Sequence, residues 1–432
     1  MTLRDRQILH LALPSIVSNI TVPLLGLVDV AIVGHMGNAV YIGAVSVGSM
    51  IFNTIYWLFG FLRMGTSGMT SQALGRRKLG TVSQLLVRSL AVALAIALVL
   101  ILLQVPIKRI AMFLVEPEVE IETLASDYFN ICVWGAPAML SLYALCGWMV
   151  GMQNTRLPMI VSITQNVVNI MASICLVYGF KMKIEGVAWG TVIAQYVGVL
   201  VAVLVICRCY GRLGKYLKWK GLFGKRKMFD FFKLNTDIFF RTVCLVAVNL
   251  FFLSFGARQG SLILAVNTLL VQLYILFSYF LDGFAFAGEA ICGKYYGASN
   301  NAAFQETVRR VFVWGAFVAL FFTCIYLFGG LHFLNLLTDQ KEVVERAADF
   351  YYWAVAVPLV GVSAFVWDGV FIGITASRGM LLSSVAATLS FFICFGAMQG
   401  LYGNHALWMA FLLFLAVRGI VQTFIFIKCY NK

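Results

Sequence analysis

Long apolar stretches dominate this sequence and decide what it can fold into. Each is about 20 residues long or more, and a helix of that length crosses the hydrocarbon core of a bilayer. Because lipid offers the backbone no hydrogen bonds, a spanning segment must satisfy its own, as a helix does. The sequence therefore predicts an all-α polytopic membrane protein with twelve transmembrane helices, at 8–33, 42–70, 85–107, 128–151, 158–179, 186–207, 234–256, 262–288, 308–336, 350–374, 380–401 and 405–428.

Composition excludes an ordinary soluble domain. Of the 432 residues, 61% are hydrophobic and 12% are charged, whereas soluble domains carry about 25% charged residues. The net charge of +14 would suit nucleic acid, but the basic residues fall in short loops between apolar stretches, which is typical of topology signals. We therefore expect no nucleic-acid partner. The cysteines stand mostly singly in apolar segments, so we expect no disulfide framework and no metal site.

The loops alternate in charge along the chain. Cytoplasmic loops of membrane proteins carry an excess of lysine and arginine. We therefore expect a multi-pass protein of the cytoplasmic (inner) membrane with a retained first span and both termini in the cytoplasm. The basic loops contain Arg4, Arg6, Arg76, Arg77, Lys78, Arg156, Arg378, Lys428, Lys432 and the run from Arg208 to Lys233, and the acidic loops contain Glu116, Glu118, Glu120, Glu122, Asp127, Asp339, Glu342, Glu345 and Asp349.

The second half of the sequence repeats features of the first at an offset near 222 residues. Residues 65–88 and 287–310 place glycine and arginine at the same spacing, and residues 151–156 resemble residues 373–378. With an even number of helices per repeat, both halves have the same topology, and their pseudo-twofold axis lies along the membrane normal. We predict two six-helix lobes: an N-lobe of residues 1–211, a cytoplasmic basic linker of residues 212–229 and a C-lobe of residues 230–432.

The first span carries a carboxylate, Asp29. At helical spacing it shares a stripe with Ser15 and Ser18, so this stripe should face protein or water rather than lipid. Ser18 is therefore a candidate for lining a cavity. Acids inside a membrane are costly and by default mark a functional site, although an aspartate held structurally by hydrogen bonds is the alternative.

Pro23 precedes this acid by six residues. Proline leaves the carbonyl of Asn19 without its helical partner, so we expect a bend between Asn19 and Gly26. Protonation of Asp29 could bias the two shapes of such a helix. A low-dielectric cavity favours the protonated acid, which would let Asp29 load and release a proton near neutral pH.

Two further helices of the N-lobe carry polar residues. The predicted helix 158–179 holds five of them on one face, and helix 186–207 holds two that are one turn apart. Polar residues in line inside an apolar helix favour a cavity lining, but hydrogen bonding between helices is an open alternative. The residues are Ser162, Gln165, Asn166, Asn169 and Ser173 in the first helix and Thr191 and Gln195 in the second.

Several short motifs, in this order, resemble the multidrug and toxic compound extrusion (MATE) family, and those of the second half resemble its DinF-type branch. The resemblance implies a twelve-helix, V-shaped antiporter that exports organic cations and other amphiphiles in exchange for protons or sodium ions. The motifs lie at Leu11–Pro14, Val28–Asp29, Val33–Gly37, Arg63–Gly68, Gln72–Gly75, Asp237, Arg241–Thr242, Ala265–Asn267, Asp282–Glu289 and Asp368–Gly369.

The resemblance also implies a cation site in the N-lobe. Relatives join the acid of the first helix to an asparagine and an acid of the fifth helix and a threonine of the sixth. Asp29, Asn169 and Thr191 match that set, but Ser173 stands where the second acid is expected and Leu25 where a tyrosine is. Sodium is best held by several hard oxygens, so we expect proton coupling, with sodium possible and no other cofactor.

The C-lobe contains five charged residues inside predicted helices: Asp237, Arg241, Asp282, Glu289 and Asp368. Asp237 and Arg241 are four residues apart, which favours pairing on one helix. Buried charges usually occur in pairs, so we interpret the set as a neutralised network that closes the cytoplasmic side. A second proton-coupling site is the alternative.

Together these features predict a secondary antiporter, expected to be monomeric, whose partners are amphiphilic or cationic small molecules and membrane lipids. A flippase or exporter of a lipid-linked or amphiphilic metabolite is the alternative. Such a flippase would need a strongly cationic cavity for pyrophosphate, and the helices contain few lysines and arginines. A membrane-embedded enzyme is disfavoured, because the four histidines lie in separate segments and no paired aspartate motif occurs.

Overall fold

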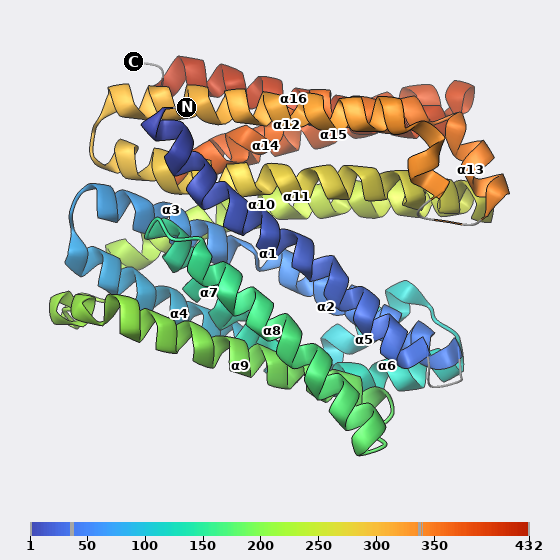
Figure 1. Cartoon of the computed structure of the whole chain (residues 1–432), viewed down its shortest axis with the longest axis horizontal. Coiled ribbons are helices and arrows are strands. Elements are labelled where there is room, and N and C mark those ends of the chain that lie inside the picture. The colour runs from blue at the N-terminus through green and yellow to red at the C-terminus, as the bar shows by residue number, and fades with distance from the viewer. Residues whose placement is uncertain (1, 35–38, 336–337, 339, 431–432) are drawn as a thin grey trace. The chain divides into compact units, whose positions relative to one another are not determined.

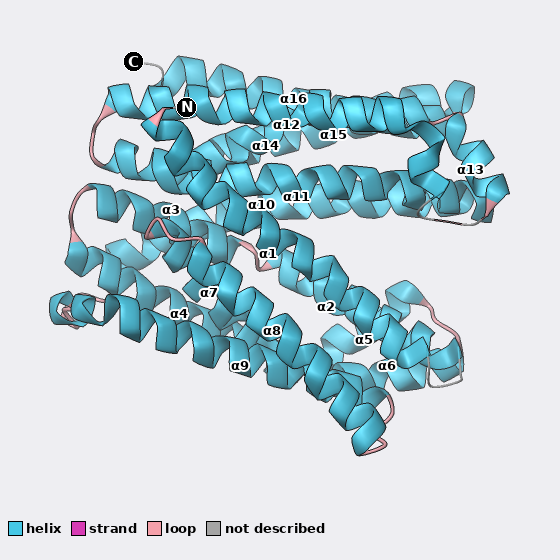
Figure 2. Ribbon diagram, viewed as in Figure 1, coloured by secondary structure: helices cyan, strands magenta, loops and turns pink. Residues whose placement is uncertain are grey.

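The computed structural model describes residues 2–34, 39–335, 338 and 340–430, and over these ranges the chain is helical without a strand (Figures 1 and 2). The helices are α1 (Leu3–Gly34), α2 (Ala39–Leu58), α3 (Phe61–Gly75), α4 (Leu79–Leu102), α5 (Gln104–Val115), α6 (Val119–Cys132), α7 (Ala136–Gly151), α8 (Arg156–Ile174), α9 (Ile184–Tyr210), α10 (Lys225–Arg258), α11 (Ser261–Gly297), α12 (Asn301–Asn335), α13 (Lys341–Ala348), α14 (Tyr351–Gly373), α15 (Ser377–Tyr402) and α16 (Asn404–Tyr430).

The all-α polytopic fold predicted from the sequence is confirmed. Eleven helical segments in the described ranges are long and apolar enough to cross a membrane. Two of them combine neighbouring helices, because Val40–Gly75 contains α2 and α3, and Val119–Gly151 contains α6 and α7. Helix α1, with 32 residues, covers the predicted first span. Each of the twelve predicted spans therefore falls on a helix or helix pair.

The chain divides into two compact units near the predicted linker. Val17–Phe231 form one unit, and Phe232–Lys432 form the other together with Met1–Ile16. The first half of α1 thus groups with the second half of the sequence, and residues 212–229 belong to the unit of Val17–Phe231. Helix α1 is one continuous element from Leu3 to Gly34. The side chain of Pro23 lies outside the described ones, so the bend beside it stays a prediction.

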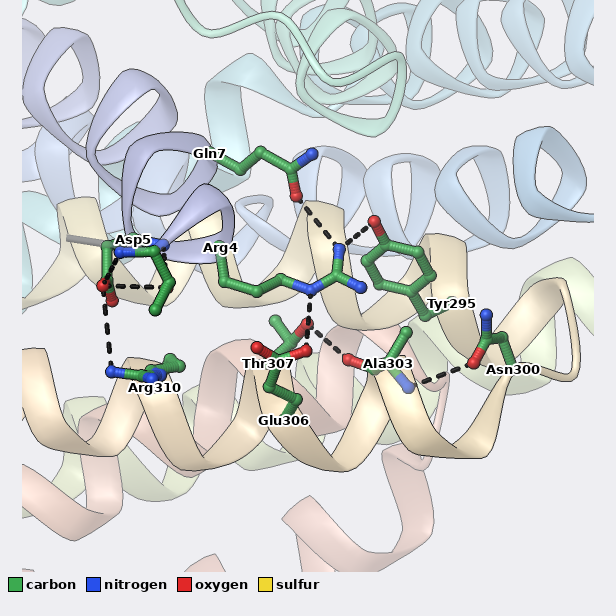
Figure 3. A network of polar contacts seen from close by, with 10 residues as sticks. Arg4, Asp5, Gln7, Tyr295, Asn300, Ala303, Glu306, Thr307 and Arg310 are labelled. Atoms are coloured by element: carbon green, nitrogen blue, oxygen red, sulfur yellow. Dashed lines mark hydrogen bonds and ion pairs between the residues drawn. The ribbon is translucent and has the colours of Figure 1, made fainter.

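A polar network at the start of α1 explains this grouping (Figure 3). Asp5 is 6% exposed and accepts hydrogen bonds from the backbone nitrogen of Thr2 at 2.7 Å and from its hydroxyl at 2.8 Å. In α12, the indole of Trp314 donates to Asp5 at 3.2 Å, and Arg310 lies 3.8 Å away. The backbone hydrogen bond from Thr2 is the largest cause of a lowered Asp5 pKa, so the carboxylate is ionised at neutral pH.

The neighbouring Arg4 adds a second set of contacts with the same unit. Its guanidinium lies over the ring of Tyr295 in α11, donates to the Tyr295 hydroxyl and pairs with Glu306 of α12 at 3.3 Å. Further along, Gly283 of α11 lets α1 come close, because a Cβ there would lie 2.9 Å from the carbonyl oxygen of Ala12. Polar and steric contacts thus both place the first half of α1 on α11 and α12.

Glycine contacts show the internal repeat in three dimensions. Helix α7 approaches α3 so closely that a Cβ on either of two glycines would come within 3.0 Å of a backbone oxygen, and α14 approaches α11 in the same way. The residues of the two helix pairs are related by an offset of 222. The contacts join Gly147 to Arg63 and Gly151 to Ser67 in the first pair, and Gly369 to Ala285 and Gly373 to Glu289 in the second.

We predict that Gly369→Ala destabilises the protein by about 1–3 kcal/mol, because the new methyl group would overlap the Ala285 backbone, which cannot move aside as a flexible side chain would. The midpoint of thermal unfolding in detergent measures the effect. Gly288→Ala is the matched control in α11, since its nearest neighbour would lie at an ordinary 3.6 Å. The close-approach interpretation is wrong if the two variants unfold at the same temperature.

Candidate functional site

Asp29 is buried in α1, with 7% of its surface exposed. Its Oδ1 has no hydrogen-bond partner among the described residues. Tyr128 and Cys132 of α6, whose side chains carry no positive charge, lie within electrostatic reach of Asp29. Tyr128 contacts Ser49 of α2 at 3.4 Å through its hydroxyl. The helix-1 acid therefore faces polar but uncharged groups.

Helix α8 and the π-helical turn after it (Cys175–Gly179) hold the backbone of α1 on both sides of Asp29. Asn166 donates to the carbonyl of Thr21 at 3.0 Å, and the Thr21 hydroxyl lies 3.5 Å from that of Ser162. Past the acid, the hydroxyl of Tyr178 donates to the carbonyl of Ile32 at 3.2 Å. These three contacts fix where the acid-bearing part of α1 lies within its unit.

Asn169 and Thr191, two of the residues that the resemblance groups with Asp29, are in direct contact. The Asn169 amide donates to the Thr191 hydroxyl at 3.0 Å, and that hydroxyl donates to Val187 within α9 at 3.1 Å. The Oδ1 of Asn169, whose side chain is buried, has no partner in the described ranges. No hydrogen bond joins Asp29 to either residue there, so Asn169 and Thr191 form a pair of their own.

Ser173 is fully buried where α8 meets α9. A Cβ on Gly190 would lie 2.9 Å from the backbone nitrogen of Ser173 and would overlap its hydroxyl. Because the two helices approach so closely here, only a small side chain fits at position 173. The backbone of α9 therefore leaves little space at position 173 for a side chain larger than serine.

The other cavity-lining candidates divide into two groups. Asn166 bonds the α1 backbone, and Gln195 lies against Gly135 beside Tyr56, so both connect helices. Gln165 and Ser18 are partly exposed. A Cβ on Gly198 of α9 would lie 3.3 Å from the Gln165 side-chain oxygen. Bonding between helices is thus observed for Asn166, and the lining of a cavity by this set stays a prediction.

Asp368 of α14 is the centre of a charged cluster in the other unit. Arg241 of α10 forms an ion pair and hydrogen bond with it, and Arg418 of α16 lies 3.5 Å away. Gln422, one turn after Arg418, donates to the second oxygen of Asp368 at 2.8 Å. Two guanidinium groups thus surround one carboxylate, and Asp368 is 8% exposed.

The pairing of Asp237 with Arg241 expected from their spacing is wrong. Asp237 accepts a hydrogen bond from Ser377 of α15 at 2.7 Å, while Arg241 turns to Asp368. Glu289 is fully buried at the close approach of Gly373, and Asp282 acts electrostatically on Arg241. The charged residues predicted for this lobe are thus spread over several contacts.

Arg418 and Gln422 are members of the cluster that the sequence interpretation missed. The signal was present, because an arginine inside an otherwise apolar span requires a partner. The guanidinium of Arg418 also lies 5.5 Å from the ring centre of Phe365 and 5.7 Å from that of Phe414. Its partner could not be chosen from sequence, because Asp368 lies on a different helix.

Comparison with known proteins finds the same family in both halves of the chain. A model of the MatE family matches residues 14–175 and again residues 238–398. The chain belongs to the MATE family of transporters. It is 38% identical to DNA damage-inducible protein F of Escherichia coli K12, over 97% of this chain and 91% of that protein. The family membership and the likeness to the DinF-type branch are thereby confirmed.

Two other relatives are more distant. The chain is 19% identical to the multidrug export protein MepA of Staphylococcus aureus, over 92% of this chain and 88% of that protein. The crystal structure of the Vibrio cholerae MATE transporter VcmN in the bent form shares the fold, with a TM-score of 0.85 at 18% identity, covering 98% of this chain and 96% of that one. Members of the family are multi-pass membrane transporters of small molecules.

We predict that Asp368→Asn destabilises this MATE protein by about 3–5 kcal/mol, because the buried guanidinium groups of Arg241 and Arg418 would lose the carboxylate that they share. Unfolding of the purified protein in detergent measures the loss. Asp237→Asn is the control, since asparagine can still accept the hydrogen bond from Ser377. Equal stability of Asp368→Asn and wild type would contradict a structural role for the cluster.

Proposed function

We propose that this protein is a secondary antiporter that exports organic cations and other amphiphilic small molecules in exchange for protons, with Asp29 as the coupling group. Its membership of a transporter family supports the general activity, and the multidrug export protein MepA among its relatives supports the substrate class. The observation that carries the coupling role is the buried Asp29 carboxylate with an unbonded oxygen.

The surroundings of Asp29 suit a proton better than a metal cation. In the described ranges no ion pair involves Asp29, and its ionisable neighbours Tyr128 and Cys132 supply no positive charge. A buried carboxylate without a counter-charge favours its neutral, protonated form. A sodium site would need several hard oxygens, and the position of a second acid is held by Ser173 against Gly190. Sodium is therefore the less favoured coupling ion.

The proposed cycle uses two states of α1. Deprotonated Asp29 binds a cationic substrate or favours one arrangement of α1, and protonation from outside favours the other arrangement and releases the substrate. A proton can shift this equilibrium only by binding the two states with different affinity. Asn166 and Tyr178 contact the α1 backbone on either side of the acid, and the two proposed arrangements of α1 would differ between these contacts.

The proposed orientation places both termini and the basic loops in the cytoplasm, in the cytoplasmic membrane. Arg4 and Arg6 precede the first apolar span, and the linker between α9 and α10 is rich in lysine and arginine, whereas residues 116–122 contain four glutamates. The positive-inside rule assigns the first two regions to the cytoplasm. Asp29 then lies toward the outer half of the membrane, where it can receive protons from outside.

We predict that Asp29→Asn abolishes export, because the amide cannot exchange a proton. Efflux of a fluorescent organic cation from cells that express the protein measures the activity, and the amount of protein in purified membranes measures insertion. Asp237→Asn is the matched control, because it neutralises an acid bonded to Ser377 in the other unit and should retain export. Unchanged efflux by a normally inserted Asp29→Asn variant would exclude the proposed coupling group.

A second prediction concerns the coupling ion. In vesicles that contain the purified protein, an imposed pH gradient should drive uptake of a fluorescent cation when sodium is absent, because Asp29 is the titratable group. The Asp29→Asn variant in the same vesicles is the control and should not respond to the pH gradient. A strict requirement for a sodium gradient would overturn proton coupling while leaving the assignment of Asp29 open to the preceding test.

A further inference from the structure

The linker between α9 and α10 is held against the start of α4 through its own backbone. Ser83 donates to the carbonyl of Leu213 at 3.0 Å, and the Gln84 amide donates to that of Lys218 at 2.7 Å. Arg88 is 2% exposed and donates from Nε and Nη2 to the single carbonyl of Leu222, at 3.1 and 2.8 Å. A buried arginine is thus used to hold a loop.

The positions that hold the linker lie on one face of α4. Gly80, Gln84 and Arg88 follow each other at intervals of four residues, which places their side chains one above the other. A Cβ on Gly80 would lie 3.1 Å from the carbonyl oxygen of Tyr216, so the linker backbone passes close to the helix there as well. Leu222 is buried with 2% of its surface exposed. The linker is therefore an ordered layer on α4.

Because the backbone makes these contacts, the basic side chains of the linker are left on the outside. Seven lysines and arginines are exposed, and none forms an ion pair with a carboxylate in the described part of the chain. The sequence contains no acid between Glu185 and Asp230, so no local counter-charge is present. The seven are Arg212, Lys215, Lys218, Lys220, Lys225, Arg226 and Lys227, of which Lys227 donates a hydrogen bond to the Gln84 side chain at 2.9 Å.

The same segment exposes four large aromatic side chains. Exposure of their apolar surface to water is unfavourable. The exposed fractions are 51% for Tyr216, 72% for Trp219, 54% for Phe223 and 65% for Phe229. Exposed apolar groups gathered in one segment mark an interaction surface. Tyrosine and tryptophan in particular are enriched at membrane–water interfaces. Residues 212–229 therefore expose basic and aromatic side chains on the same segment.

We propose that the basic linker, residues 212–229, which comprises the segment after α9 and the first five residues of α10, binds the anionic lipid headgroups of the membrane surface on its own side of the bilayer. The linker joins two membrane spans directly, since α9 ends at Tyr210 and α10 begins at Lys225, so a lipid surface is within reach at both of its ends. Phosphate-bearing anionic headgroups complement the lysines and arginines. The headgroup boundary accommodates the rings, as it does for interfacial aromatic residues.

Fluorescence quenching of Trp219 tests the proposal on the full chain. The protein is reconstituted in equal mixtures of phosphatidylcholine and phosphatidylglycerol in which either one or the other lipid carries brominated chains. The difference in emission between wild type and Trp219→Phe isolates Trp219 from the other tryptophans of the nine in the chain. We expect brominated phosphatidylglycerol to quench Trp219 more than brominated phosphatidylcholine, with a preference that declines as salt is added.

Charge variants make the test selective. Lys218→Gln with Lys220→Gln should weaken the preference for phosphatidylglycerol by roughly fivefold for each charge removed. Arg77→Gln with Lys78→Gln is the matched control, because it removes two exposed basic residues from the neighbouring loop between α3 and α4 and should leave the preference unchanged.

Three outcomes would overturn the proposal. Absence of quenching by either lipid would place the linker in water or against a protein partner, and equal quenching by both would show residence at the interface without choice of anionic lipid. A preference that survives in the Lys218 and Lys220 variant would assign the selection to other residues.

Discussion

The fold depends on direct contact between helix backbones at glycine. In lipid, helices gain little from excluding water, so close packing and hydrogen bonds between them hold a bundle together. Gly147 and Gly151 bring α7 against α3, and Gly369 and Gly373 bring α14 against α11. These contacts build the same frame in each unit. The close contact between helices is thus the same in the two units, whereas the buried polar residues of the two units differ.

The comparison between Asp29 and Asp368 shows how the two units use a buried acid differently. Asp368 is surrounded by two arginines and a glutamine, so its charge is balanced and its position is fixed. Asp29 has neutral neighbours and an oxygen without a partner among the described residues. A paired acid gains little from taking up a proton, but an isolated one gains much. A proton-dependent step is therefore expected at Asp29 rather than at Asp368.

The sequence predicted the spans and their repeat because both depend on local properties, the length of apolar stretches and the spacing of glycine and arginine. The sequence also indicated an acid inside the first span, and Asp29 is buried there. The family resemblance grouped Asn169 with Thr191, and these two side chains are in contact. Side-chain contacts between different helices could not be predicted from the sequence, because they depend on how the helices pack. Asp237 had a suitable neighbour four residues away, yet it is Ser377 of another helix that donates to it. Likewise, the limit that Gly190 sets on position 173 depends on the distance between α8 and α9.

The grouping of the first sixteen residues with the second half of the chain has a consequence for biogenesis. Arg4 and Asp5 are among the first residues to be synthesised, but Glu306, Arg310 and Trp314, which they contact, follow about 300 residues later. At the usual rate of about 5–20 residues per second, that interval lasts roughly 15–60 s. The first helix made is therefore among the last to complete its contacts, and until then Asp5 lacks the partners that α12 provides.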